Sequence, residues 1–237
     1  MGGIVSDQLQ TLRDYLTRHH GGDGSVAAQR TLEGHARNHD DLFRRFWAEQ
    51  AEPVLSRGSR VVDLGCGPGL FLRDLSLSGP ELDLVGVEAA PYMLEQACED
   101  DYDFSIRVAD LNDPPADLFE AESIDAVLAN RLLHELHQPL VLLQQLHDWL
   151  KPGGVLILVD MVRQPLGSFL THKFGQDRLD ERQDAKAMAA LFEDYFEHNR
   201  YHDYDLLALL SLTGYEVLAD ESIRSGRAVQ IAARRPL

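Results

Sequence analysis

Short apolar runs alternate with longer segments of helical spacing through the middle of the chain. The runs are rich in valine, isoleucine and leucine, and turn residues or helix-like stretches separate them. These strand candidates are residues 60–65, 82–88, 104–110, 123–130 and 153–160. Runs that are apolar throughout, such as VLILV, are typical of strands buried on both faces. The alternation therefore predicts a doubly wound, mostly parallel α/β sheet.

Helical spacing precedes this sheet. Apolar residues recur at helical spacing within residues 6–20, until the glycine-rich GGDG breaks the pattern. A second helical region follows and reaches about residue 50. We therefore expect residues 1–54 to form an N-terminal helical cap and residues 55–237 to form the main domain.

The pattern changes again after residue 160. Residues 161–180 have no clear period, whereas residues 181–198 carry apolar side chains at helical spacing. We expect residues 161–200 to be an insertion that serves as a lid. The remaining expected elements are a short helix within residues 203–214 and two strands, 215–220 and 227–233. Because a short connection joins these last strands, they should pair in an antiparallel way at the edge of the sheet.

Composition and charge narrow the class of protein. The chain has 237 residues, 44% of them hydrophobic, which suffices for the core of one α/β domain with additions. Its formal net charge of -17 would repel a phosphate backbone, so no nucleic-acid partner is expected. No apolar run is long enough for a membrane span, and the two cysteines, Cys66 and Cys98, form no CxxC pair. We expect a cytoplasmic protein with no membrane partner.

A glycine-rich loop follows the first strand candidate in the sequence VVDLGCGPG. Gly65, Gly67 and Gly69 allow a sharp turn and a close approach of the backbone to a ligand. A dinucleotide fingerprint would place its third glycine at Leu70, so the spacing argues against a nicotinamide cofactor. Asp63 would lie under the ligand, where a carboxylate suits a cationic amino-acid group better than a pyrophosphate.

This loop resembles the first motif of the class I S-adenosylmethionine-dependent methyltransferases, and the similarity extends over about residues 55–160. The resemblance implies a Rossmann-like seven-stranded fold and in-line methyl transfer from S-adenosylmethionine to an oxygen or nitrogen of a small molecule. It places Glu88 at the ribose hydroxyls and Asp110 at the adenine. The cofactor-binding residues expected from it are Asp63, Gly65, Cys66, Gly67, Gly69, Glu88, Ala89, Met93, Asp110, Leu111 and Asn130.

A candidate base follows the fourth strand candidate. His134-Glu135-Leu136 is similar to the His-Asp-Trp segment of plant-type small-molecule O-methyltransferases, whose histidine is the base, so the resemblance implies a catalytic His134. Here the tryptophan is replaced by Leu136 and the aspartate by Glu135. The HELH sequence does not match a zinc-protease helix, because His134 and His137 are three residues apart and not four. No metal is expected.

The acceptor should bind above the carboxyl ends of the strands, under the N-terminal helices and the insertion. Its expected pocket residues are Phe46, Trp47, His172, Tyr195 and Tyr201. The negative net charge favours a neutral or cationic acceptor. As an alternative, the apolar stripe from Met188 to Tyr195 could form a homodimer contact.

Two rival functions remain open at this point. A protein with the same fold could bind S-adenosylmethionine or S-adenosylhomocysteine without transferring a methyl group. A nicotinamide-dependent oxidoreductase is the second rival, and the glycine spacing disfavours it.

Overall fold

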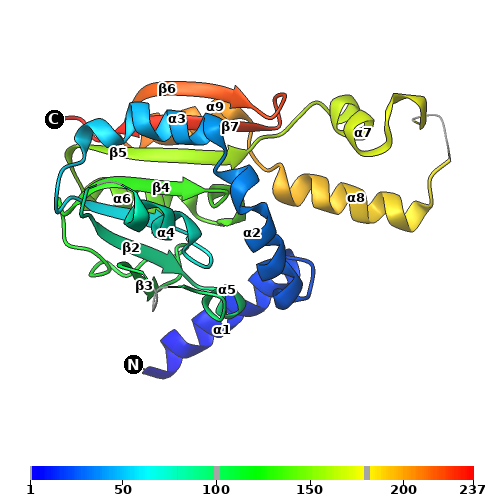
Figure 1. Ribbon diagram of the computed structural model, residues 1–237. Helices are drawn as coiled ribbons and strands as arrows, with labels where there is room; N and C mark the ends of the chain where they lie inside the picture. The colour runs from blue at the N-terminus through cyan, green and yellow to red at the C-terminus, as the bar shows by residue number, and fades with distance from the viewer. Residues whose placement is uncertain (1, 79, 99–101, 179–181) are drawn as a thin grey trace.

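A seven-stranded sheet forms the centre of the computed structural model, which describes residues 2–78, 80–98, 102–178 and 182–237 (Figure 1). The strands are β1 (Arg60–Leu64), β2 (Asp83–Glu88), β3 (Ser105–Val108), β4 (Ile124–Asn130), β5 (Leu150–Met161), β6 (Glu216–Ile223) and β7 (Ala228–Arg234). Their order is β3-β2-β1-β4-β5-β7-β6, and β7 runs antiparallel to both of its neighbours. The predicted mostly parallel, doubly wound sheet and its antiparallel terminal pair are confirmed.

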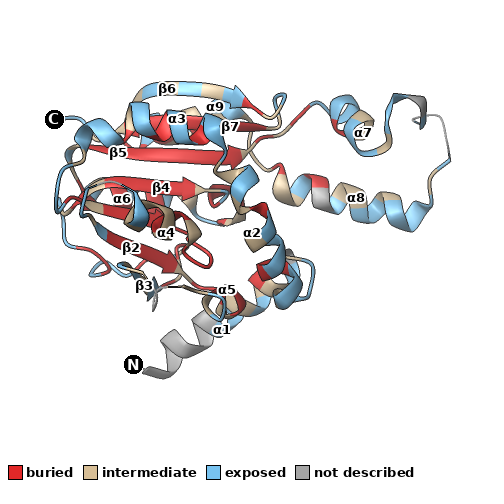
Figure 2. Ribbon diagram, in the orientation of Figure 1, coloured by how far each residue is buried: buried red, intermediate tan, exposed pale blue. Residues whose placement is uncertain are grey.

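Helices cover both faces of the sheet. Their bounds are α1 (Gly2–His19), α2 (Gly24–Asn38), α3 (Asp41–Gln50), α4 (Leu70–Leu77), α5 (Pro91–Leu94), α6 (Pro139–Trp149), α7 (Leu166–Phe174), α8 (Ala185–His198) and α9 (Asp203–Leu212), with 3-10 turns η1 (Glu52–Val54), η3 (Leu133–Glu135) and η4 (Gln176–Arg178). Helices α3 and α4 pack on one face, and α6 and α9 pack on the other. Burial is concentrated in the strands, as Figure 2 shows. Among the described helices, none has both the length and the apolar character of a membrane span.

The strand register brings the site together at one edge of the sheet. Leu64, the last residue of β1, pairs with Val87 of β2 on one side and with Ala129 of β4 on the other. All three strands are parallel, so the residues that follow leave the sheet at the same edge. Glu88 and Asn130 are therefore placed beside the glycine loop.

The predicted N-terminal cap has two parts with different positions. An N-cap divides its second helical region, because the Asp40 carboxylate accepts a hydrogen bond from the Phe43 amide (3.0 Å) and starts α3 there. Helix α3 then lies on the sheet, where Phe46 and Trp47 are 0% and 3% exposed. Helices α1 and α2 instead lie across the carboxyl ends of the strands (Figure 1).

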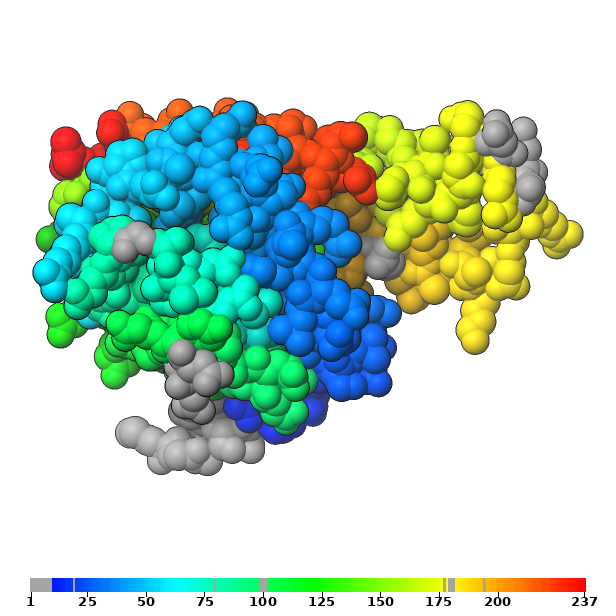
Figure 3. Space-filling model, viewed as in Figure 1, coloured from blue at the N-terminus to red at the C-terminus, as the bar shows by residue number. Residues whose placement is uncertain are grey.

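The segment after β5 forms an arm that projects beyond the sheet (Figure 3). It contains α7, which the sequence pattern did not predict, and the expected helix α8. Helix α7 buries one side chain, Phe169, whose ring lies 4.5 Å from that of Tyr195 on α8. A helix that buries a single side chain has no continuous row of apolar residues. The sequence of α7 therefore shows no helical spacing of apolar residues.

Candidate functional site

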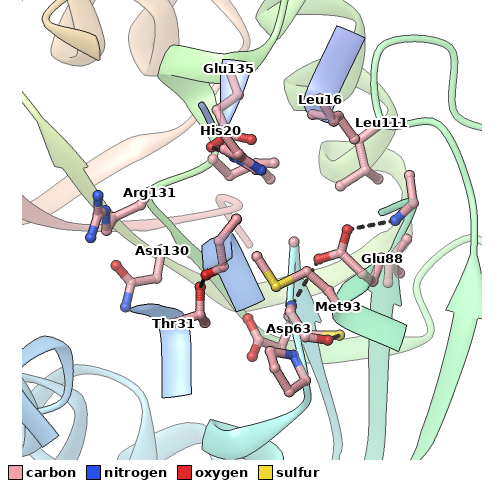
Figure 4. Close-up of a pocket in the computed structure, with 18 of the residues that line it drawn as sticks. Leu16, His20, Thr31, Asp63, Glu88, Met93, Leu111, Asn130, Arg131 and Glu135 are labelled. Carbon is pink, nitrogen blue, oxygen red and sulfur yellow. Dashed lines mark hydrogen bonds and ion pairs between the residues drawn. The ribbon is translucent and has the colours of Figure 1, made fainter. Parts of the chain in front are cut away.

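A cavity of about 610 Å³ lies at the carboxyl ends of β1, β2 and β4, under α1 and α2 (Figure 4). The predicted cofactor residues that line it are Asp63, Gly65, Cys66, Gly67, Glu88, Ala89, Met93, Asp110, Leu111 and Asn130, and His134 lines it as well. Gly69 is placed differently, because it is the N-cap of α4 and a Cβ there would lie 2.7 Å from the Phe104 ring. Its role in this structure is to allow the turn into the helix.

The glycine loop is held against β2 by backbone hydrogen bonds. The amides of Gly65 and Cys66 both donate to the Val87 carbonyl, at 2.8 and 3.1 Å. Gly65 and Gly67 have φ angles of 68° and 56°, a region in which residues with a Cβ are strained. A Cβ at Gly65 would in addition lie 3.1 Å from the Leu132 side chain. Because these glycines have no side chains, the backbone of the loop is accessible from the cavity.

Glu88 is the acceptor for three backbone amides. Its Oε1 accepts from Ala89 and Ala90, both at 2.8 Å, and its Oε2 accepts from Gly67 at 2.9 Å. Burial raises the pKa of Glu88, and these amides act against that rise. A carboxylate offers about four acceptor positions, so about one remains on Oε2. A ligand diol that donated both hydroxyls to Glu88 would have to replace one of the amide bonds.

Asp63 is a buried carboxyl group without a hydrogen-bond donor among the described residues. It is 4% exposed and lines the cavity. Burial, and then the negative charge of Glu88, raise the pKa of Asp63 well above its ordinary value. An unpaired buried carboxylate is costly, and a cation in the cavity would remove that cost. This end of the cavity is therefore suited to a positively charged group.

Apolar side chains also line the cavity. Leu111 and Met93 are 6% and 7% exposed, and Leu16 of α1 lies beside Leu111 (Figure 4). Asp110 begins a tight turn, since its Oδ1 accepts from the amide of Asn112 at 2.8 Å. The periodic leucines of α1 predicted the helix, but only its position in the fold shows that Leu16 reaches this cavity.

His134 is paired with a buried carboxylate that sequence reasoning missed. Its Nδ1 lies 2.6 Å from Oδ1 of Asp160, and its backbone amide donates to Oδ2 at 3.1 Å. Burial lowers the pKa of His134, but the charge and hydrogen bond of Asp160 outweigh it, and the pKa lies above its ordinary value. Nε2, the other ring nitrogen, is 3.8 Å from Oε1 of Glu135. The pair fixes the imidazole with Nδ1 toward Asp160.

A second network joins α1 to the loop after β4. His20 Nε2 lies 2.9 Å from Glu135 Oε1, and His20 Nδ1 lies 2.5 Å from the Tyr92 hydroxyl. Burial, and then the charges of Glu135 and Glu88, raise the pKa of Tyr92. These contacts hold the roof of the cavity over the strand ends. Although histidines and acids gather here, no three of the described His, Cys, Asp or Glu residues are arranged to hold a metal ion.

His39, the C-cap residue of α2, holds Asn130 in place. Its Nε2 lies 3.2 Å from Nδ2 of Asn130, and its Nδ1 lies 3.3 Å from the His35 carbonyl. Burial, and then the charge of His35, lower the pKa of His39 to about 4. At neutral pH the ring is therefore uncharged, so that Nδ1–H donates to the carbonyl and Nε2 accepts from the amide. No pattern in the sequence predicted this pairing.

The five residues predicted for the acceptor pocket lie outside the cavity. Phe46 and Trp47 are in the core under α3, because that helix lies flat on the sheet. On the projecting arm, His172 accepts a hydrogen bond from Arg227 (2.6 Å), and the Tyr195 hydroxyl donates to the Gln164 carbonyl (2.5 Å). Tyr201 packs against the core of the other face. The described part of the arm reaches the cavity through His198, and α2 forms the wall that these residues were expected to form.

Comparisons with known proteins agree with this arrangement. A family model described as "Methyltransferase domain" matches residues 32–220. The ubiquinone biosynthesis O-methyltransferase of Cereibacter sphaeroides is 28% identical over 127 residues, which cover 53% of this chain and 51% of that protein. The trans-aconitate 2-methyltransferase of Methylobacterium radiotolerans is 31% identical over 123 residues, which cover 48% and 46%. The chain thus spans about half the length of these curated relatives.

Solved structures share the fold. Phosphoethanolamine N-methyltransferase 2 of Haemonchus contortus, solved in complex with S-adenosyl-L-methionine, superposes with a TM-score of 0.65. The superposition covers 95% of this chain and 60% of that one, at 14% identity. At this identity the likeness concerns the fold, and the site has to be argued from its own residues.

Proposed function

Because the chain belongs to the methyltransferase domain family, within the class I S-adenosylmethionine-dependent methyltransferases, we propose that it transfers a methyl group from S-adenosylmethionine to an oxygen or nitrogen of a small-molecule acceptor. One observation carries the proposal. The buried carboxyl group of Asp63, which has no hydrogen-bond donor in the part of the chain that the structure describes, shares a cavity with the open backbone of the glycine loop and with Glu88. A ligand with a cationic amino group and hydroxyl groups satisfies both acids.

The residues present fit this cofactor. Asp63 would bind its amino group, because a cation there neutralises a carboxylate that the fold leaves without a donor. Glu88 would accept a hydrogen bond from the ribose through the remaining position on Oε2. Leu111 and Met93 would contact the adenine, with Asp110 at its edge. Gly67 lies between these groups, and its lack of a Cβ leaves the room that the ligand needs.

His134 would act as the base for an acceptor that carries a hydroxyl group. When bound, the cofactor supplies an electrophilic methyl group, and in-line displacement depends chiefly on positioning. A hydroxyl must lose its proton as it attacks, and His134 Nε2 can take that proton while Asp160 stabilises the resulting imidazolium. Because its pKa is raised, the histidine becomes available as a base at a higher pH than an ordinary histidine does. An amine acceptor would not depend on it.

Calorimetric titration with S-adenosylhomocysteine, with NAD as the comparison ligand, tests the cofactor. We expect binding of S-adenosylhomocysteine alone, with a Kd of about 1 µM, which corresponds to about 8 kcal/mol. Glu88→Ala should weaken it by about tenfold or more, since a carboxylate hydrogen bond is lost and the loop loses its anchor. Glu95→Ala, which removes the same group from an exposed position just after α5, is the matched control.

The two rivals predict different results in the same experiment. Binding of NAD in preference would indicate an oxidoreductase, and binding of neither ligand would overturn the proposal. A protein that only binds the cofactor would retain S-adenosylhomocysteine affinity but transfer no radiolabelled methyl group to any of a panel of phenols, carboxylic acids and amines. Turnover with one acceptor class would identify the methylated atom.

A further inference from the structure

Four arginines lie close together, and two of them line one end of the cavity, in a chain whose net charge is -17. Arg37 and Arg131 line the cavity itself. Arg224 reaches the same wall, since its Nη2 donates to the Arg37 carbonyl at 3.3 Å and to Oδ1 of Asn38 at 3.2 Å. Arg227 lies farther from the cavity, since its Nε donates to the Arg224 carbonyl at 2.9 Å and its Nη1 donates to His172 on the projecting arm. We call these four residues the arginine cluster.

The charge of the arginine cluster is not balanced locally. Among the described residues, no carboxylate forms an ion pair with any of the four arginines, whereas Arg60 and Arg234 are each paired with an acid. Burial, and then the positive charge of Arg131, lower the pKa of Arg224, and the carboxylate of Asp40 acts in the opposite direction. Arg37 and Arg131 are exposed and Arg224 is partly buried, so their positive charges repel one another most strongly around Arg224, and an anion placed among them removes the repulsion.

Arg131 lies at the end of the cavity away from Glu88, which the proposed cofactor would leave to the acceptor. In Figure 4, Arg131 and Asn130 are on the side opposite Glu88, and Thr31 lies between the two ends. Arg131 has a φ of 60°, an unfavourable conformation for a residue with a Cβ. Its backbone amide nevertheless stays bound to the Val159 carbonyl at 2.6 Å. Local strain that the surrounding sheet maintains is frequently associated with a functional position.

We propose that the acceptor carries an oxyanion group, a carboxylate or a phosphate, which Arg37, Arg131 and Arg224 bind. This inference rests on the proposed methyl transfer, and it names the substrate class for the same site. The guanidinium group is planar and donates two parallel hydrogen bonds to such an anion. An anion bound at Arg131 would be affected mainly by the charges near it and less by the net charge of the chain, because more distant charges are screened beyond about 10 Å. This proposal differs from the expectation of a neutral or cationic acceptor, which used the net charge alone.

Calorimetry on the full chain loaded with S-adenosylhomocysteine provides the test, with benzoate, phenyl phosphate and benzamide as probes. We expect one of the two anions to bind about tenfold or more tightly than the neutral amide, and added salt to weaken that binding. Preference for benzoate indicates a carboxylate acceptor, and preference for phenyl phosphate indicates a phosphorylated one. Anions that bind no more tightly than benzamide would overturn the proposal.

Arginine variants assign the effect to the cluster. Arg131→Gln and Arg224→Gln should each weaken binding of the preferred anion by about tenfold. Arg57→Gln is the control, since its side chain is 82% exposed and its ion pair with Glu81 is at the surface; it should change the affinity by less than about twofold. An equal loss in the control would mean that only net charge matters, and the proposal would fail.

The experiment separates this proposal from the cofactor assignment. Each variant is first titrated with S-adenosylhomocysteine, and unchanged affinity shows that the cofactor end is intact. If the wild type does not bind S-adenosylhomocysteine, the proposed function fails, and the anion titrations are made on the ligand-free chain. If Arg131→Gln and Arg224→Gln lose anion binding in these ligand-free titrations, the arginine cluster is still supported as an anion site. If neither variant loses anion binding, the arginine cluster is rejected as an anion site.

Discussion

Replacement of Asp63 by asparagine should change stability and cofactor affinity in opposite directions. The substitution keeps the shape of the side chain and removes its charge. Burial and the charge of Glu88 raise the pKa of Asp63 well above its ordinary value, so the folded protein keeps a proton there up to a higher pH than the unfolded chain does, and ionised Asp63 is destabilising. Without ligand, Asp63→Asn should therefore be the more stable protein at neutral pH, by about 1–3 kcal/mol.

The pH dependence of this gain has a defined sign. Between the ordinary value of 3.8 and its raised pKa, Asp63 binds more protons in the folded state than in the unfolded state, so wild-type stability decreases as the pH rises through this window. Below pH 3.8 the carboxyl group is protonated in both states. The difference between wild type and variant, measured by urea unfolding at a series of pH values, should therefore shrink on acidification.

Cofactor affinity should fall in the same variant. Loss of a charged partner for the amino group removes about 1.5–3 kcal/mol, which weakens S-adenosylhomocysteine binding about ten- to a hundredfold. A bound cation also favours ionised Asp63, so wild-type binding should release protons within the pH window in which the free protein holds one. Calorimetry in two buffers of different ionisation enthalpy measures this release, and Asp63→Asn should abolish it.

Glu120→Gln is the control for Asp63→Asn, because it removes one negative charge from an exposed position. It should leave the free energy of unfolding and the S-adenosylhomocysteine affinity unchanged. If Asp63→Asn binds S-adenosylhomocysteine as tightly as wild type and releases as many protons, Asp63 does not meet the amino group. If the variant is less stable than wild type at neutral pH, the argument from burial is wrong.

Three further outcomes follow from the site and the core. His134→Gln should lower turnover of a hydroxyl acceptor about a hundredfold and leave S-adenosylhomocysteine affinity unchanged; unaltered turnover would exclude a base role. The pKa of His134 is raised, so its pair with Asp160 should stabilise the folded protein fully below about pH 6.5, and this stabilisation should be lost as the pH rises through the folded pKa. Urea unfolding of Asp160→Asn should lack this pH dependence. Gly86→Ala should cost about 1–3 kcal/mol in thermal unfolding, since the new Cβ would lie 2.5 Å from Sγ of Cys66, whereas Gly167→Ala, which meets nothing within 4 Å on helix α7, should be neutral or stabilising.

The sequence by itself determined the strands and the loop. Val61 and Val62 are both fully buried, in the cores on opposite faces of the sheet, and a run of such residues is what a central parallel strand requires. The loop glycines have positive φ angles because the chain must turn there without side chains. These features depend on neighbours along the chain, so a local pattern was enough to predict them.

Only the tertiary structure decided which distant side chains meet. Asp160 lies beside His134, 26 residues away, because β5 pairs with β4. His39 meets Asn130 across 91 residues because α2 crosses the strand ends. The same placement brings the arginine cluster together and leaves Phe46 and Trp47 in the core. A helical period shows that a helix has a buried face, but the partner of that face depends on how the elements pack, and packing involves contacts that no local pattern encodes.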